Sequence, residues 1–251
     1  MVGFAWQSRR QMTIPPVERS PQIYARMAGL LYLAIILLGL FGEVFVRGSL
    51  VVDGDPAATA DHIAASQFLW RAGIAGDLLM HVLDVPQIVI FYLLLRPVSE
   101  SLALLAAFLN LVQTAVLALN KLTLLVPIFL LDGGSVLKAL PPQELHTLSY
   151  LAIKLHGHGF AIGLVFFGWT CLVLGHLIFR SGYLPKALGV LMQVAGVSYL
   201  VNSFVLLLAP SFAPSIFPAI LVPAFIGEMS LCLWLLAKGV NLPQWQQRVK
   251  P

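Results

Sequence analysis

Charged residues are scarce in this chain of 251 residues. Lys, Arg, Asp and Glu together make up 10% of the sequence, whereas a soluble globular domain carries about 25%. Apolar residues make up 59%, and the mean hydropathy is +0.89. A soluble fold cannot hide so much apolar surface, so the composition excludes that class and predicts a protein whose solvent is the lipid bilayer.

Cysteine is also nearly absent. Cys171 and Cys232 both fall within apolar segments, which excludes a disulfide framework and a cysteine-rich metal centre. The sequence contains no glycine-rich phosphate-binding loop, nucleophile elbow or dinucleotide-binding fingerprint. The net charge of +4 does not indicate nucleic acid as a partner, because the basic residues lie at the chain ends and in short loops without interleaved aromatic residues.

Six long apolar segments account for most of the chain. Each reaches the roughly 20 residues that a helix needs to cross a hydrocarbon core about 30 Å thick, and none has the alternating pattern of barrel strands. We therefore predict an all-α fold, a polytopic transmembrane helical bundle. The six spans are predicted at residues 26–46, 70–95, 101–131, 147–179, 185–209 and 215–237.

The distribution of basic residues predicts the orientation of the bundle. Cytoplasmic loops carry an excess of Lys and Arg, and placing both termini in the cytoplasm leaves only Arg47, Arg71 and Lys138 in the outer segments. We expect a cytoplasmic tail at 1–25, one six-helix domain at 26–238 and a cytoplasmic tail at 239–251. The first tail lacks the apolar region of a signal peptide.

Two helix starts occur in the predicted outer loops. Asp55 followed by Pro56 combines an N-cap carboxylate with a proline at the first helical position. Residues 57–67 are therefore predicted to form a short helix at the outer interface. Pro142, which precedes the fourth span, is a second such start, so we expect that helix to begin outside the membrane.

The second span carries three ionisable residues in its middle, Asp77, His81 and Asp84. Their spacing places all three on one helical face. An Asp near the centre of a spanning helix costs about 2.5–3.5 kcal/mol on insertion scales, so this face must be buried against other helices or line a wet cavity. Polar residues of other spans fall at similar depths, and we predict an outward-facing cavity that binds a small molecule or an ion. The predicted cavity and ion-pathway residues are Asp77, His81, Asp84, Lys121, His156 and Glu228.

Three interpretations of these residues remain open. The charges can neutralise one another between helices, as Asp77 and Lys121 would in a structural or accessory subunit. They can form a titratable pathway for proton, ion or small-molecule transport. The third interpretation is a membrane-embedded enzyme that acts on a lipid or small apolar substrate, with Asp84 or Glu228 as general base. Its candidate metal ligands are His81, Asp84 and His156. The sequence assigns no cofactor and no catalytic residue.

Four segments resemble those of a known family. They are RMAGLLYLAIILLGLFGEVFVRGSLVV, DPAATADHI, GDLLMHVLDV and LHGHGFAIGLVFFGWTCLVLGHLIFRSGYLPKALGVL. Together they resemble the bacterial membrane-protein family catalogued as domain of unknown function 4386, from Arg26 to about Lys238. The resemblance implies a multi-pass integral protein of a bacterial cytoplasmic membrane, and Asp77, Asp84 and His156 match the family pattern. It implies no activity.

Overall fold

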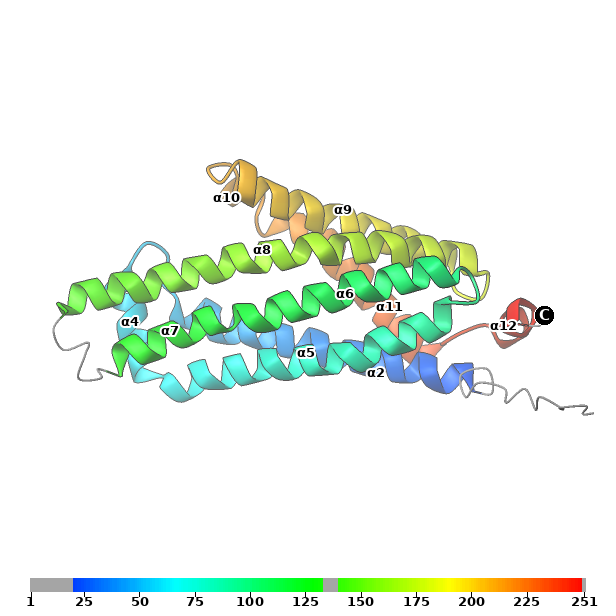
Figure 1. Ribbon diagram of the computed structural model, residues 1–251, viewed down its shortest axis with the longest axis horizontal. Coiled ribbons are helices and arrows are strands. Elements are labelled where there is room, and N and C mark those ends of the chain that lie inside the picture. Colours follow the sequence, from blue (N-terminus) through cyan, green and yellow to red (C-terminus); the bar gives the residue numbers. More distant parts are fainter. Residues whose placement is uncertain (1–19, 133–139, 250–251) are drawn as a thin grey trace, which may run out of the picture.

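The computed structural model describes residues 20–132 and 140–249. Most of the predicted N-terminal tail and the outer residue Lys138 lie outside these ranges. Within the described residues all regular structure is helical, which confirms the all-α fold class. The helices run nearly side by side in an elongated bundle (Figure 1). We call the end that holds both described termini the inner end, and the opposite end the outer end.

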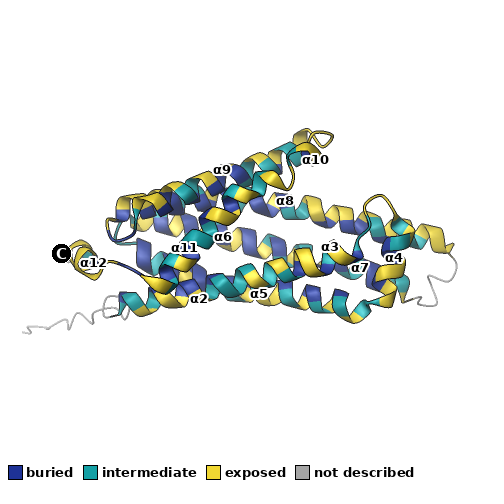
Figure 2. Ribbon diagram, turned by 180° about the vertical axis from the view of Figure 1, so that it is seen from behind, coloured by how far each residue is buried: buried dark blue, intermediate teal, exposed yellow. Residues whose placement is uncertain are grey.

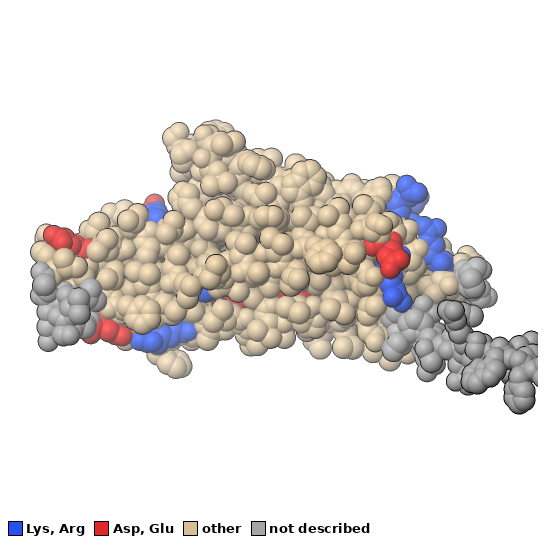
Figure 3. Space-filling model, in the orientation of Figure 1, with Lys and Arg blue, Asp and Glu red and all other residues tan. Residues whose placement is uncertain are grey.

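Six helices of the described chain are long and apolar enough to cross a membrane, which confirms the predicted number of spans. The charged side chains visible in Figure 3 gather near the two ends, with a broad and largely uncharged band between them. This is the arrangement expected of a bundle whose middle lies in hydrocarbon. The six spans are Pro21–Leu50, Gln67–Leu95, Glu100–Leu131, Pro142–Ser181, Lys186–Leu208 and Ala219–Ala237.

The first span is not a uniform helix. α2 (Pro21–Leu40) continues as the π-helix η1 (Phe41–Arg47) and ends in α3 (Gly48–Leu50). The predicted interfacial helix follows as α4 (Pro56–Ala65). The side chain of Asp55 accepts a hydrogen bond from the backbone N–H of Ala58 at 3.0 Å, so the predicted N-cap is confirmed.

The second and third spans differ in continuity. α5 (Gln67–Leu95) is a single helix that passes through Pro86. The third span is interrupted at Lys121, where α6 (Glu100–Asn120) gives way to α7 (Leu122–Leu131). The interruption occurs at the residue whose side chain reaches across to α5, as described below.

The fourth and fifth spans pack through glycines. α8 (Pro142–Ser181) begins at the predicted proline, and its 40 residues span about 60 Å, so it extends beyond the hydrocarbon core. α9 (Lys186–Leu208) lies against it. A Cβ added to Gly175 would lie 2.6 Å from the carbonyl oxygen of Gly189, and one added to Gly189 would lie 2.6 Å from that of Gly175. The two backbones approach so closely that only glycine fits there.

The last span completes a hairpin with α9. The chain passes through α10 (Ala213–Ile216) and η3 (Ala219–Leu221) into α11 (Val222–Ala237). α11 meets α2 near the inner end, where a Cβ added to Gly29 would lie 2.8 Å from Leu236. Towards the outer end, α9 and α11 lean away from the other helices (Figures 1 and 2).

Two apolar clusters lie towards the two ends of the bundle. The outer cluster lies around Trp70, whose Nε1–H donates to the carbonyl oxygen of Leu124 at 2.9 Å. The inner cluster is larger and joins every span, with Leu94 and Leu177 at its centre. Along α5 the outer cluster therefore comes first, the polar residues next and the inner cluster last.

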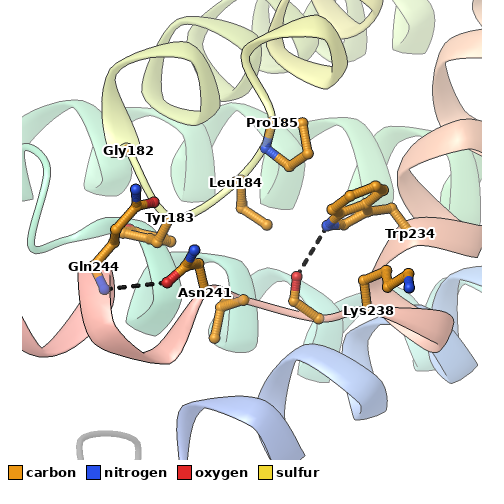
Figure 4. A pocket seen from close by; sticks show the side chains of 10 residues that line it. Gly182, Tyr183, Leu184, Pro185, Trp234, Lys238, Asn241 and Gln244 are labelled. Atoms are coloured by element: carbon orange, nitrogen blue, oxygen red, sulfur yellow. Dashed lines mark hydrogen bonds between the residues drawn. The ribbon is translucent and has the colours of Figure 1, made fainter.

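The predicted C-terminal tail contains a helix that the sequence analysis did not anticipate, α12 (Leu242–Val249). The Trp245 side chain is 1% exposed and packs edge-on against the ring of Tyr183, with 4.8 Å between centroids. The backbone N–H of Asn241 donates to the carbonyl oxygen of Tyr183 at 2.9 Å. Beside these contacts is a pocket of about 300 Å³ (Figure 4). Gln22 of α2 donates to the carbonyl oxygen of Lys238 at 2.6 Å, so the two described ends of the chain are joined.

Candidate functional site

A cavity of about 310 Å³ lies within the bundle between the two apolar clusters. Its walls come from α2 with η1, α5, α6, α8, α9, η3 and α11. The structure brings five of the six predicted cavity residues to this one space, whereas His156 is not part of its lining. The five lining residues are Asp77, His81, Asp84, Lys121 and Glu228.

The cavity has a polar wall and an apolar wall. α5 and α6 supply most of the polar side chains, because their polar residues recur three or four positions apart and so share one face of each helix. α2, α8 and α11 contribute mainly apolar side chains. The polar wall consists of Asp77, His81, Asp84, Gln87, Asn110, Gln113 and Lys121. The apolar wall includes Ile35, Ile36, Leu40, Phe160, Leu164, Phe167, Leu221 and Phe225.

Asp77 is the centre of a buried ion-pair group. One of its oxygens, Oδ2, lies 2.7 Å from a guanidinium nitrogen of Arg47 and 2.9 Å from Nζ of Lys121. The side chains of Asp77 and Lys121 are 1% and 3% exposed. Arg47 also binds Glu43 at 2.8 Å. The Asp77–Lys121 contact is the one expected from charge neutralisation between helices, and it joins α5 to α6.

The local structure of η1 makes this ion-pair group possible. Gly42 lies in η1 one position before Glu43, and a Cβ at Gly42 would overlap the Asp77 carboxylate and lie 3.1 Å from the Arg47 guanidinium. The absence of a side chain at Gly42 therefore lets η1 approach α5 closely enough for Arg47 to reach Asp77. π-Helical insertions occur frequently at functional sites.

Asp84 and Glu228 have only neutral hydrogen-bond partners. Asp84 accepts a hydrogen bond from Nδ2 of Asn110 at 3.3 Å and another from the hydroxyl of Thr114. Glu228 accepts one from the hydroxyl of Tyr199. Within the described part of the chain neither carboxyl group forms a salt bridge. Both therefore lie deep in the bundle without a basic side chain to balance a negative charge.

Four buried polar atoms on the cavity wall lack a protein partner among the described residues. They are Oδ1 of Asp77, Nε2 of His81, Oε1 of Gln87 and Oδ1 of Asn110, on residues that are all less than 9% exposed. Buried polar groups in proteins are almost always hydrogen-bonded. A space of about 310 Å³ has room for roughly ten waters at ~30 Å³ each. The four atoms have almost no accessible surface in this conformation, so water or the polar part of a ligand would reach them after a small side-chain rearrangement.

His156 is engaged elsewhere. Its Nδ1 lies 3.0 Å from Nδ2 of Asn120, and the same Nδ2 donates to the His156 carbonyl oxygen at 2.9 Å. A Cβ on Gly159 would overlap the Asn120 side chain, so this glycine makes the contact possible. No three His, Cys, Asp or Glu side chains of residues 20–132 and 140–249 are grouped so as to hold a metal ion. The structure thus does not assemble a metal site from His81, Asp84 and His156.

Sequence reasoning missed several residues of the site. Gln87 follows Asp84 by three positions, so extending the helical periodicity by one turn would have found it. The sequence predicts Arg47 in an outer segment. In the structure the π-helical geometry of η1 turns the Arg47 side chain towards the cavity, and no simple sequence pattern predicts a π-helix there. Tyr32 and Tyr199 line the cavity beside Glu228, but a tyrosine in an apolar segment is otherwise typical of the core or the membrane interface.

Six long apolar helices around a cavity with one polar wall define the class of this molecule as a multi-pass helical membrane protein. A family model described as "Domain of unknown function (DUF4386)" matches residues 27–239, and the chain belongs to this family. A protein of Archaeoglobus fulgidus named "Uncharacterized protein" is 30% identical over 171 residues, which are 68% of this chain and 86% of that relative. The family expected from the sequence is thus confirmed, with an archaeal relative. No solved structure matches the chain.

Proposed function

We propose that this protein is a transporter that moves a small molecule through the central cavity and exchanges protons as it does so. The observation that supports this most directly is the polar wall. It carries Asp84, a carboxyl group without a basic partner, and the unpartnered Nε2 of His81. Glu228 of α11, a second carboxyl group without a basic partner, lines the same cavity. Such groups are costly in a membrane, and carboxylates and histidines placed there commonly serve as ion or proton pathways.

The proposal divides the charged residues by role. The group around Asp77 is internally balanced, because Lys121 and Arg47 face one carboxylate while Glu43 takes the second nitrogen of Arg47. We assign this group to fastening α5, α6 and η1 together. Asp84, which lies seven residues further along α5 towards the inner end, is left to exchange a proton for a guest.

Transport needs the cavity to open towards the inner end, where the inner apolar cluster closes it. The α9–α11 hairpin is the element best suited to move. It contacts α8 at the facing glycines Gly175 and Gly189, and it contacts α2 at the inner end. At the outer end it leans away from the other helices (Figure 2). Paired glycines provide a smooth surface along which two helices can slide or rotate.

The first test is proton movement in proteoliposomes that contain an entrapped pH-sensitive dye. Uptake is measured under an imposed potassium diffusion potential, alone and with a panel of small amines, alcohols and carboxylates. We expect uptake above that of protein-free liposomes with at least one of these conditions, and its loss in Asp84→Asn. The matched control is Asp61→Asn, which alters an exposed carboxylate of α4 outside the cavity and should leave uptake unchanged.

Two outcomes would contradict the proposal. Proton movement equal to that of protein-free liposomes in every condition would refute transport through this cavity. Equal uptake in wild type and in a folded Asp84→Asn variant would refute the role given to Asp84. Retention of the wild-type elution volume and helicity establishes that the variant is folded.

We also propose that the protein lies in a prokaryotic cytoplasmic membrane with the inner end in the cytoplasm. The support is the basic character of that end, where the loops and helix ends carry Arg26, Arg96, Arg180, Lys186, Lys238 and Arg248. Both native cysteines are buried, so exposed cysteines can be introduced as reporters. A membrane-impermeant maleimide should label Asp61→Cys in intact cells and leave Gln246→Cys unlabelled. The reverse pattern would refute this orientation.

A further inference from the structure

The cavity has a mouth on the side of the bundle. α2 and α11 meet at the inner end, where Sγ of Cys232 lies 3.4 Å from the carbonyl oxygen of Gly29. Further out, Leu40 of α2 and Phe225 of α11 line the cavity yet are 37% and 47% exposed. Glu43, at the outer rim of the same opening, has a side chain that is 64% exposed. The opening lies between two membrane-spanning helices, and its edges are the apolar side chains of Leu40 and Phe225, so we infer that it faces the lipid.

The charges on the cavity wall favour a cation. Four carboxylic residues line the cavity, Glu43, Asp77, Asp84 and Glu228, against the two basic residues Arg47 and Lys121. The two basic residues are already paired with Glu43 and Asp77. The acidic residues in excess are therefore Asp84 and Glu228, whose hydrogen-bond partners are all neutral. A positively charged guest would balance a negative charge on these carboxyl groups. Aromatic rings surround the same region and add a favourable surface for a cation. The aromatic lining residues are Tyr32, Phe91, Phe160, Phe167, Tyr199 and Phe225.

The unpartnered atoms favour a guest that donates hydrogen bonds. Three of the four are oxygens, on Asp77, Gln87 and Asn110, and because the oxygen of Asp77 packs against Gly42, those of Gln87 and Asn110 are the candidates for a guest. Nδ2 of Asn110 already donates to Asp84, so the free atom of this amide is an acceptor. The fourth atom, Nε2 of His81, can donate or accept according to its tautomer. An ammonium group with several N–H donors satisfies such a wall, whereas a phosphate, sulfonate or carboxylate does not.

We propose that the cavity binds a protonated amine attached to an apolar chain or ring, and that this molecule enters from the bilayer between α2 and α11. The ammonium group lies between Asp84 and Glu228. The apolar part lies against α2, α8 and α11 and extends through the lateral mouth. This inference rests on the proposed function, since it names the substrate class of the same cavity.

The test compares three molecules that share one apolar chain. Octylammonium, octanol and octanesulfonate are titrated into the protein in lipid nanodiscs, with protein-free nanodiscs as the blank for partitioning. We expect saturable binding of octylammonium and binding of the other two that is at least about tenfold weaker, because a hydrogen bond to a charged group is strong. Comparable binding of all three, or tighter binding of octanesulfonate, would overturn the proposal. This comparison uses the wild-type protein and does not depend on any variant.

Variants then locate the binding site. Asp84→Asn and Glu228→Gln should each weaken octylammonium binding by about ten- to a hundredfold and reduce the preference over octanol, whereas Asp61→Asn should have no effect. Unchanged binding in both folded cavity variants would refute the site. A double-chained cationic lipid, which cannot leave the bilayer, should compete with octylammonium if the mouth faces the lipid. Failure to compete would refute the lateral route.

The binding and transport experiments separate this inference from the proposed function. Saturable octylammonium binding without any proton movement would support the ligand class and refute transport. Proton movement that depends on Asp84, in a protein that does not bind octylammonium, would support transport and refute the ligand class. Each measurement therefore decides its own claim.

Discussion

Replacement of Asp77 by Asn removes the anion that two buried cations share. Lys121 has a side chain that is 3% exposed and lies 2.9 Å from Asp77, and Arg47 is 12% exposed at 2.7 Å. Breaking a buried ion pair by removing one partner costs about 3–5 kcal/mol, because the remaining charge stays buried and unpaired. We expect Asp77→Asn to lower the free energy of unfolding by about this amount.

Two further variants test the origin of that loss. Lys121→Met leaves Asp77 with Arg47 and should cost about 1–3 kcal/mol. The double variant Asp77→Asn/Lys121→Met buries no unpaired lysine and leaves Arg47 with Glu43, 2.8 Å away. We therefore expect the double variant to be more stable than Asp77→Asn alone, with a coupling energy of at least about 1 kcal/mol.

Thermal unfolding in detergent, followed by circular dichroism, provides the measurement. At about 2–4 °C per kcal/mol for a chain of this size, Asp77→Asn should lower Tm by about 6–20 °C. The reasoning would be refuted if Asp77→Asn were no less stable than Lys121→Met. It would also be refuted if the two losses simply added in the double variant.

Three other perturbations have expected outcomes. Gly175→Ala forces a methyl group to within 2.6 Å of a facing carbonyl oxygen and should lower the free energy of unfolding by about 1–3 kcal/mol in the same assay. The control is Gly157→Ala, whose added carbon meets no atom within 4 Å and should not destabilise the protein. Trp245→Ala should release α12, which limited proteolysis would detect as faster cleavage near the C-terminus than in wild type. The hydrogen bond from Lys154, at 2.6 Å, holds the pKa of Asp53 below its ordinary value. The contact therefore stabilises the folded protein fully at pH values above the pKa that Asp53 has in the unfolded chain. This stabilisation is lost as the pH falls through the pKa of Asp53 in the folded protein. Lys154→Met should raise the Asp53 pKa in an NMR titration, and an unchanged value would contradict the assignment.

The sequence predicted the helices better than it predicted the site. Length and hydropathy determine where a helix can cross a bilayer, and the cap at Asp55 and the start at Pro142 follow from local chemistry. Asp77, His81 and Asp84 share a face because they are on one regular helix, which is also a local property.

The contacts between helices could not be predicted in the same way. The position of His156 along its helix predicted the depth of this residue in the membrane and placed it level with the cavity. It does not specify which neighbouring side chain His156 meets, and Asn120 holds His156 outside the cavity lining. Arg47 turns inward because η1 departs from α-helical geometry. The partners of Glu228 come from α2 and α9, so their arrangement depends on how the whole bundle packs. The predicted C-terminal tail shows the same limit, because the docking of α12 depends on Tyr183 in a distant turn.

The position of α11 has a consequence for how the protein is made. Synthesis proceeds from the N-terminus, so five spans leave the ribosome before α11, which supplies Glu228 and one side of the lateral mouth. Until α11 inserts, the polar face of α5 has no complete shelter from the acyl chains. The nascent bundle therefore has a stage at which its ionisable residues are open to lipid or to the insertion machinery. The final hairpin, joined to α2 by the hydrogen bond from Gln22 to the carbonyl oxygen of Lys238, then covers these residues except at the lateral mouth.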